Sequence, residues 1–310
     1  MFNGVNHVGI TVSDMKRSMK FYDDLLGFKE VIFDYTGLLP GMELVSGKPE
    51  TKARIVMLSN KNKGPIGLGN IKLINLLPPD MARPIPKTET WGETGIAEIA
   101  LNTRNSASIF GELVLKGAKP LLTPAIPEVF PPYDNNVVAF SYVADPDGTK
   151  IELNALCTAW PGLGTEPRVE GINHVAFGVS NMDKALKFYR RLGFTELVVD
   201  STGFVSGMAT WYPKPTKLHI VILANYHGAW IEAIEHQPAS RQINNNWGRL
   251  GPMEFAIGVS NIEKAYVKLQ EEGIKFLSPP QKLDVTSGEW KYVYLDAPDK
   301  LCVSLVEARY

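Results

Sequence analysis

An internal repeat constrains the fold of this chain more than any other feature of its sequence. Residues 4–22 read GVNHVGITVSDMKRSMKFY and residues 171–189 read GINHVAFGVSNMDKALKFY, with ten identities in 19 aligned positions at a constant offset of 167. The likeness continues in the LGF of residues 26–28 and 192–194. Self-similarity at a fixed spacing is typical of a duplicated structural unit. Two related halves are therefore predicted within the 310 residues.

A weaker repeat divides each half again. GVSN at 178–181 recurs at 258–261, each time ahead of a helical pattern and a glycine, and the first half has a counterpart that starts at Gly95. We therefore expect an N-terminal half, 1–159, and a C-terminal half, 160–310, each built from two modules. The four modules are predicted at about 4–77, 95–157, 171–236 and 251–308.

The order of the predicted elements is the same in each module. An alternating strand comes first, and Ser13, Ser180 or Ser260 follows it as the expected N-cap of a helix. The helix ends at a glycine, and three strands rich in Val, Ile, Tyr and Leu complete the module. This β-α-β-β-β order indicates an α+β fold. A helix covers one face of the sheet, and the other face is free to curl around a ligand.

Composition excludes several classes of function. The 32 basic and 33 acidic residues leave a net charge of -1, which gives no electrostatic footprint for nucleic acid or for an anionic membrane surface. No run approaches the roughly 20 apolar residues of a membrane span, and the first residues lack a secretory signal pattern. Cys157 and Cys302 fit a reducing cytoplasm better than a disulfide. We therefore expect a small-molecule substrate as the partner, and a monomer or a homodimer.

Polar side chains recur at one position in the first strand of every module. The NHV motif places His7 and His174 on short apolar strands of the two halves. Alignment of the modules on their glycine motifs puts Glu98 and Glu254 at the same position in the other two. Taken singly, each side chain is more often a packed or solvated residue than a ligand. A buried charge is costly unless it is paired or bound to a metal, so the recurrence favours a shared role.

The last strand of each module supplies a second recurring position. Glu152 follows the DPDG turn of the second module, and Glu232 lies within WIEAIEH of the third. Lys72 and Ser304 are their counterparts in the first and fourth modules. Imidazole and carboxylate ligands suit Zn²⁺, Ni²⁺, Fe²⁺, Mn²⁺ or Co²⁺ rather than Ca²⁺, which prefers oxygen ligands alone. One divalent metal ion is therefore the expected cofactor.

These motifs together resemble a known superfamily. NHVGITVSDMKRSMKFYDDLLGF and NHVAFGVSNMDKALKFYRRLGF, with DPDGTKIEL closing a module, are similar to the vicinal oxygen chelate proteins. That superfamily includes glyoxalase I, methylmalonyl-CoA epimerase, extradiol dioxygenases, and the fosfomycin and bleomycin resistance proteins. The resemblance implies that pairs of modules close into cups. Four modules would form two cupped, mixed eight-stranded sheets, with the metal held inside by first-strand and last-strand residues.

The resemblance leaves two ways to pair the modules. If the second module pairs with the third and the first with the fourth, one cup has a complete ligand set and the other has Lys72 beside Glu254. If the first pairs with the second and the third with the fourth, each cup has one histidine and two carboxylates. The four residues that fit both arrangements are the first metal-site candidates, and His7 and Glu254 form a second set. The first candidates are Glu98, Glu152, His174 and Glu232.

Three chemistries remain open for such a site. The leading hypothesis is an isomerase, epimerase or lyase that removes a proton next to a carbonyl and forms a metal-stabilised enediolate, with Glu152 or Glu232 as the catalytic base. An alternative is an Fe(II) ring-cleaving dioxygenase, in which Tyr142 would contact the substrate. The other alternative is a non-catalytic protein that binds a hydrophobic ligand in a cleft lined by aromatic side chains such as Trp230.

Overall fold

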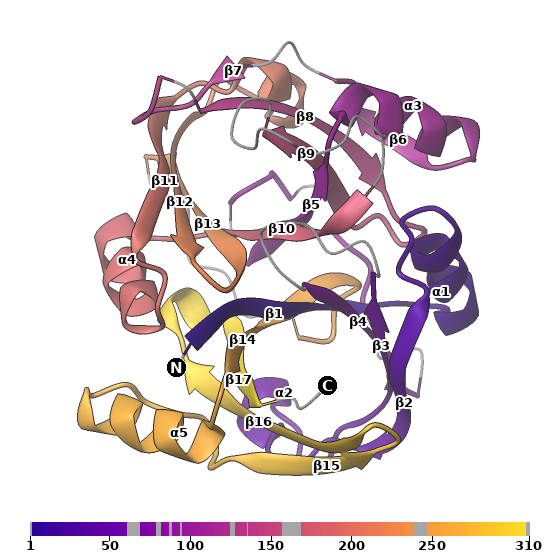
Figure 1. Ribbon diagram of the computed structural model, residues 1–310, viewed down its shortest axis with the longest axis vertical. Coiled ribbons are helices and arrows are strands. Elements are labelled where there is room, and N and C mark those ends of the chain that lie inside the picture. The colour runs from indigo at the N-terminus through magenta and orange to yellow at the C-terminus, as the bar shows by residue number, and fades with distance from the viewer. Residues whose placement is uncertain are drawn as a thin grey trace.

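Figure 1 shows the chain as two cups, one above the other, in a computed structural model. Strands β5 and β8–β13 surround the upper hollow, and β1–β4 with β14–β17 surround the lower one. The ten-residue helices lie outside the cups, whereas a short helix at Glu43–Ser46 lies within the lower one. Among the described residues, no helix is long and apolar enough to cross a membrane. The structure describes residues 2–60, 69–78, 82–86, 89–93, 95–124, 128–134, 136–156, 169–238 and 247–307, so Cys157 lies outside them.

The lower cup is built from the first and fourth modules, whose order is the predicted one. The first module contains β1 (Phe2–Thr11), α1 (Met15–Asp24), β2 (Glu30–Leu38), the short α2 (Glu43–Ser46), β3 (Lys52–Ser59) and β4 (Asn70–Leu77). The fourth contains β14 (Gly251–Val259), α5 (Ile262–Glu271), β15 (Gln281–Val285), β16 (Gly288–Asp296), the 3₁₀ turn η3 (Pro298–Lys300) and β17 (Cys302–Glu307).

The upper cup is built from the second and third modules. The second contains β5 (Ile96–Thr103), α3 (Ser106–Leu115), β6 (Lys119–Leu122), β7 (Glu128–Val129), β8 (Val137–Ala144) and β9 (Lys150–Leu156). The third contains β10 (Val169–Gly178), α4 (Met182–Arg191), β11 (Glu196–Gly203), the 3₁₀ helix η2 (Ser206–Trp211), β12 (Lys217–Asn225) and β13 (Gly228–Gln237).

One strand departs from the predicted pattern. The second strand of the second module is divided into β6 and β7, which both pair with β8. The described part of the upper cup therefore has nine strands, whereas the lower has the expected eight, and a pairing of β1 with β13, Val5 opposite Ala229, joins the two in one sheet. Proline residues punctuate this stretch, which reads KPLLTPAIPEV. Because proline cannot donate a ladder hydrogen bond, it interrupts the strand there.

The structure decides between the two pairings of modules. Strand β5 lies antiparallel to β10, and β1 lies antiparallel to β14. The second module is thus paired with the third, and the first with the fourth. Within each module the first strand also lies parallel to the last, as β10 does to β13. Each cup therefore draws its wall from segments far apart in the sequence.

The N-caps of the helices differ by one residue from the prediction. Asp14, Asn181 and Asn261 occupy the N-cap positions, where each side-chain oxygen accepts a hydrogen bond from a backbone N–H in the first turn. The predicted caps, Ser13, Ser180 and Ser260, each lie one residue earlier. The carboxylate or amide oxygen is the one that reaches the free N–H groups at the helix start.

Two of those serines instead connect the cups. The backbone N–H of Ser13 donates to Asp147, in the turn between β8 and β9, at 2.8 Å, and its hydroxyl donates to the same carboxylate at 2.6 Å. The backbone N–H of Ser180 donates in the same way to Asp299, in η3, at 3.1 Å. Both contacts join a module of one cup to a module of the other. They therefore help to fix how the cups lie against each other.

A shared apolar core lies between the two cups. The ring of Phe177, on β10 of the upper cup, stacks on that of Phe255, on β14 of the lower cup, with centroids 5.4 Å apart and planes inclined by 11°. Tyr189 of α4 packs beside both rings. All three side chains are almost fully buried. Smaller apolar clusters line each hollow separately, so stability depends most on the shared core.

We expect Phe255→Ala to destabilise the whole protein. Truncation of a fully buried phenylalanine in such a core costs about 3–5 kcal/mol, because it removes apolar contacts and leaves a cavity. Urea unfolding followed by circular dichroism measures this loss. Phe204→Ala is the matched control: this ring is 61% exposed, so its loss is expected to change the free energy of unfolding by about 0.5 kcal/mol or less. Equal effects of both variants would contradict the assignment of the shared core.

Candidate metal centre

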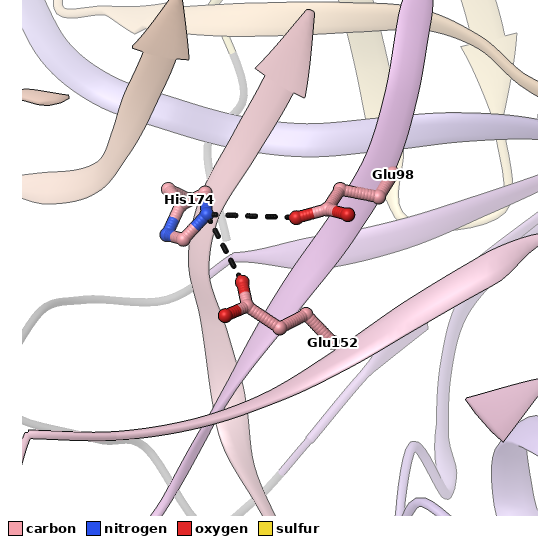
Figure 2. A group of neighbouring side chains, drawn as sticks. All are labelled: Glu98, Glu152 and His174. Atoms are coloured by element: carbon pink, nitrogen blue, oxygen red, sulfur yellow. Dashed lines mark ion pairs between the residues drawn. The ribbon is translucent and has the colours of Figure 1, made fainter. Parts of the chain in front are cut away.

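Four strands bring one histidine and three glutamates together inside the upper cup. Figure 2 shows Glu98 of β5 and Glu152 of β9 directed at the ring of His174 on β10. The Nε2 atom of His174 lies 3.2 Å from Oε2 of Glu152 and 3.9 Å from Oε1 of Glu98. Glu232 of β13 approaches the same nitrogen to 2.8 Å through its Oε2. All four side chains are buried.

The register of the strands explains why these side chains meet. In every module the first strand pairs with the last strand in the same register. The candidate ligand position of the last strand lies opposite the residue that comes two places after the candidate position of the first strand. Since side chains alternate across a strand, a shift of two keeps both on the same face. The pairs are Gly9 with Lys72, Ala100 with Glu152, Ala176 with Glu232 and Ala256 with Ser304.

The ring of His174 is oriented by its neighbour in the sequence. Asn173 donates its side-chain amide to Asn102 at 2.7 Å, and its carbonyl oxygen lies 2.7 Å from Nδ1 of His174. A carbonyl oxygen can only accept, so Nδ1 carries the proton in this contact. The lone pair of Nε2 then faces the three carboxylates. A hydrogen bond of this kind is what fixes the tautomer of a metal-binding histidine.

Glu98 is held at the floor of the site. Its carboxylate accepts a hydrogen bond from the indole N–H of Trp91 and another from the hydroxyl of Tyr142, the latter at 3.1 Å. Burial, with the charges of Glu152 and Glu232, raises the pKa of Glu98 well above its ordinary value. Glu152 is steadied differently, by the amide of Asn154 at 3.1 Å.

The cluster carries more negative charge than its protein partners can balance. Burial raises the pKa of Glu232 as well, although the charge of His174 opposes that shift. Burial alone would lower the pKa of His174, but the nearby carboxylates of Glu232 and Glu152 outweigh it and raise that pKa to about 10. Three buried carboxylates around one imidazole are therefore stabilised by a cation, either a proton or a metal ion.

A divalent metal ion fits this group of side chains. The Nε2 of His174 and Oε2 of Glu152 are buried, lie 3.2 Å apart, and form an ion pair rather than a hydrogen bond of good geometry. Two ligand atoms bonded to one ion at about 2.1 Å can be no more than about 4.2 Å apart. The separations from Nε2, 2.8 to 3.9 Å, are within that limit. Glu98, Glu152 and His174, with Glu232 beside them, could hold the ion.

A cavity opens above this cluster. Glu152 and Glu232 face it from the floor, and apolar side chains of β8, β11 and β12 form most of its wall. Trp230 and Tyr142, both predicted to contact the substrate, line it too. The hydroxyl of Tyr142 is already bonded to Glu98. The arrangement can therefore place a small apolar molecule against the carboxylates.

The lower cup has the second set of candidates, with an ammonium group among them. The Nζ of Lys72 makes an ion pair with Oε1 of Glu254, and the hydroxyl of Tyr294 donates to the other oxygen of that carboxylate. The Nε2 of His7 lies 3.9 Å from Glu254. Burial lowers the pKa of Lys72 to about 8, and burial and the charge of Lys72 lower that of His7. Here the charge of Glu254 is balanced by lysine.

Sequence reasoning missed the residues that support the ligands. Trp91 lies in a connection between modules, where nothing marked it as a donor to Glu98. Asn173 had a signal, since the NHV motif places an asparagine before the histidine in both halves. Asn6 contacts His7 at 3.0 Å in the same manner. The repeated dipeptide therefore encodes the orientation of the ring as well as its position.

Comparison with known proteins assigns the chain to a family. A model of the Glyoxalase/Bleomycin resistance protein/Dioxygenase superfamily matches residues 4–153 and 171–292. These segments comprise most of the chain, so the protein belongs to that superfamily. The cupped sheets and their internal duplication agree with the match.

Individual relatives are more distant. A metallothiol transferase, FosB, of Shouchella clausii is 32% identical over 133 residues, which are 42% of this chain and 75% of that protein. A lactoylglutathione lyase of Schizosaccharomyces pombe is 23% identical and covers 98% of this chain and 96% of its own. The crystal structure of glyoxalase I from Zea mays is similar with a TM-score of 0.58, 17% identity, and coverage of 98% of this chain and 92% of that one. The last likeness establishes the fold alone.

We expect one divalent ion per chain, bound in the upper cup. Calorimetric titration of chelator-treated protein with Zn²⁺, Ni²⁺, Co²⁺ or Mn²⁺ measures the stoichiometry and affinity. Glu98→Gln removes one anionic ligand and is expected to weaken binding by about 100-fold or more. The double variant Lys72→Met/Glu254→Gln changes the other cup and should still bind one ion. Two ions per chain, or an unchanged affinity of Glu98→Gln, would contradict this assignment.

The ion pair of the lower cup leads to a stability prediction. Lys72→Met leaves the carboxylate of Glu254 buried without its cation, which is expected to cost about 3–5 kcal/mol of unfolding free energy. The double variant with Glu254→Gln removes both charges and should recover most of that loss, because isosteric neutral groups need no counter-charge. Chemical denaturation of the three proteins checks this. A double variant as unstable as Lys72→Met would refute the role of the pair.

Proposed function

We propose that the protein is a metal-dependent enzyme of the glyoxalase type, which removes a proton next to a carbonyl group of a small molecule as an isomerase, epimerase or lyase. One observation carries this proposal: a histidine and three glutamates are buried together, and two of the glutamates, Glu152 and Glu232, line a cavity whose other lining residues are mostly apolar. Such a cluster combines metal ligands with a base. The proposal includes a reducing, cytoplasmic setting, which the buried free thiol of Cys302 supports.

The imidazole and the three carboxylates of this cluster divide into two roles. Glu98 and His174 are restrained by their hydrogen bonds to Trp91, Tyr142 and Asn173, and we assign them as fixed ligands. A bound divalent ion would act as a Lewis acid that polarises two neighbouring substrate oxygens and stabilises the charge that develops when a proton leaves the adjacent carbon.

Glu232 is the stronger candidate for the base, and Glu152 the second. Both side chains face the cavity. Glu152 is restrained by Asn154, whereas Glu232 lies 2.8 Å from Nε2 of His174. Burial raises the pKa of Glu232, and a more basic carboxylate accepts a carbon-bound proton more readily. Its carboxylate would take the proton and return it to the neighbouring carbon.

The dioxygenase alternative has one observation in its favour. The aromatic rings of Phe140, Trp230 and Tyr142 line the cavity, and they would suit an aromatic diol. Three carboxylates make the site more anionic than the two-histidine, one-glutamate set implied for extradiol enzymes, which disfavours that chemistry. Oxygen uptake by Fe²⁺-loaded protein with catechol or hydroquinone distinguishes the two functions.

Proton exchange tests the proposal directly. We expect metal-loaded protein to exchange the α-hydrogens of 2-hydroxyacetophenone in D₂O, followed by NMR. Glu232→Gln should slow exchange by about 100-fold or more while the metal stays bound, because the amide cannot accept the proton. Glu196→Gln, on the exposed side of β11, is the matched control and should retain full activity. Undiminished exchange in both Glu232→Gln and Glu152→Gln would overturn the assignment of the base.

A further inference from the structure

The wall of the upper cavity is mostly apolar. Val138 and Phe140 of β8, Ile220 and Ile222 of β12, and Met208 of η2 contribute to it. A substrate that fills the cavity exchanges contact with water for contact with this apolar wall. Such an exchange is favourable for carbon-rich groups.

The charges around the cavity have one sign. Among the described residues that line it, the ionisable groups are Glu152, Glu232 and the phenol of Tyr142, with no lysine or arginine. The carboxylates of Glu98, Glu152 and Glu232 would leave a net negative charge even around a divalent ion. A second anionic group on the substrate would therefore be buried without a counter-charge and repelled by the floor.

Most of the hydrogen-bond donors of the lining residues bond protein acceptors. Asn136 donates to the carbonyls of Phe130 and Val198, at 3.2 and 3.0 Å. Asn154 donates to Glu152, and Asn173 to Asn102. The indole of Trp91 and the hydroxyl of Tyr142 both donate to Glu98. The indole N–H of Trp230 also lines the cavity, but it is uncharged and cannot balance the charge of a carboxylate, phosphonate or phosphate on a ligand.

We propose that the substrate is an uncharged molecule with an apolar body and a single polar end made of two neighbouring oxygens, a class that presupposes the metal-dependent function proposed above. The polar end lies against Glu152 and Glu232, and the apolar body lies between β8 and β12. Conjugates that carry carboxylates, such as those of glutathione, and phosphonates are excluded from this cavity because nothing in its described lining balances their charge.

Two chelators that differ by one charge test this substrate class. Benzohydroxamic acid presents two neighbouring oxygens on a ring with no charge at its far end, and 4-carboxybenzohydroxamic acid adds a carboxylate there. Calorimetry with Zn²⁺-loaded protein is expected to show about 100-fold tighter binding of the chelator without the carboxylate. Equal affinities, tighter binding of the carboxylate, or no binding of either chelator would overturn the proposal.

A substitution in the wall provides the matched test. Val205 is half-buried and lines the cavity, so Val205→Arg adds a cation there with little disturbance of the core. We expect Val205→Arg to reduce the preference for the chelator without the carboxylate at least tenfold, whereas Val205→Met should retain this preference. A preference unchanged in Val205→Arg would contradict the electrostatic cause. Because these measurements need no proton transfer, a failure of α-hydrogen exchange with the chelator preference intact would refute the reaction and leave the substrate class standing.

Discussion

The need to balance buried carboxylates is the constraint on which both cups depend. Glu98 and Glu254 occupy equivalent strands and are both fully buried, where an uncompensated charge is very costly. In the lower cup Lys72 supplies the balancing charge. The upper cup has Glu152 and Glu232 at the two last-strand positions where the lower cup has Lys72 and Ser304, so its balancing charge has to come from a proton or a metal ion. Two side chains thus separate an internal ion pair from the proposed metal centre.

The pairing of modules makes this difference possible. Because β5 lies against β10 and β1 against β14, each cup combines one module from each half of the chain. The two cups can then carry different ligand sets although the modules repeat. The stacked rings of Phe177 and Phe255 and the contacts of Ser13 and Ser180 hold the cups together. A cup that lacks the metal-binding side chains is therefore still held against the other cup.

Much of the fold and of the candidate site followed from particular residues. The NHV repeat located His7 and His174, and the alignment of the modules assigned Glu98, Glu152 and Glu232 to first-strand and last-strand positions. Other features lay beyond local patterns. The division of β6 from β7 depends on prolines in a strand context, and the bond from Trp91 to Glu98 joins a connecting segment to β5. Contacts of that kind leave no periodic trace in a sequence.

The sequence by itself determined the duplication, the order of elements in each module, and the side chains presented on each strand, because these follow from local periodicity and from spacing along the chain. Only the tertiary structure decided which modules share a cup, that Lys72 meets Glu254, and that Trp91 donates to Glu98. The physical reason is that similar modules offer similar strand edges. The choice between partners depends on long-range packing, such as that of Phe177 on Phe255, which brings together residues far apart in the chain.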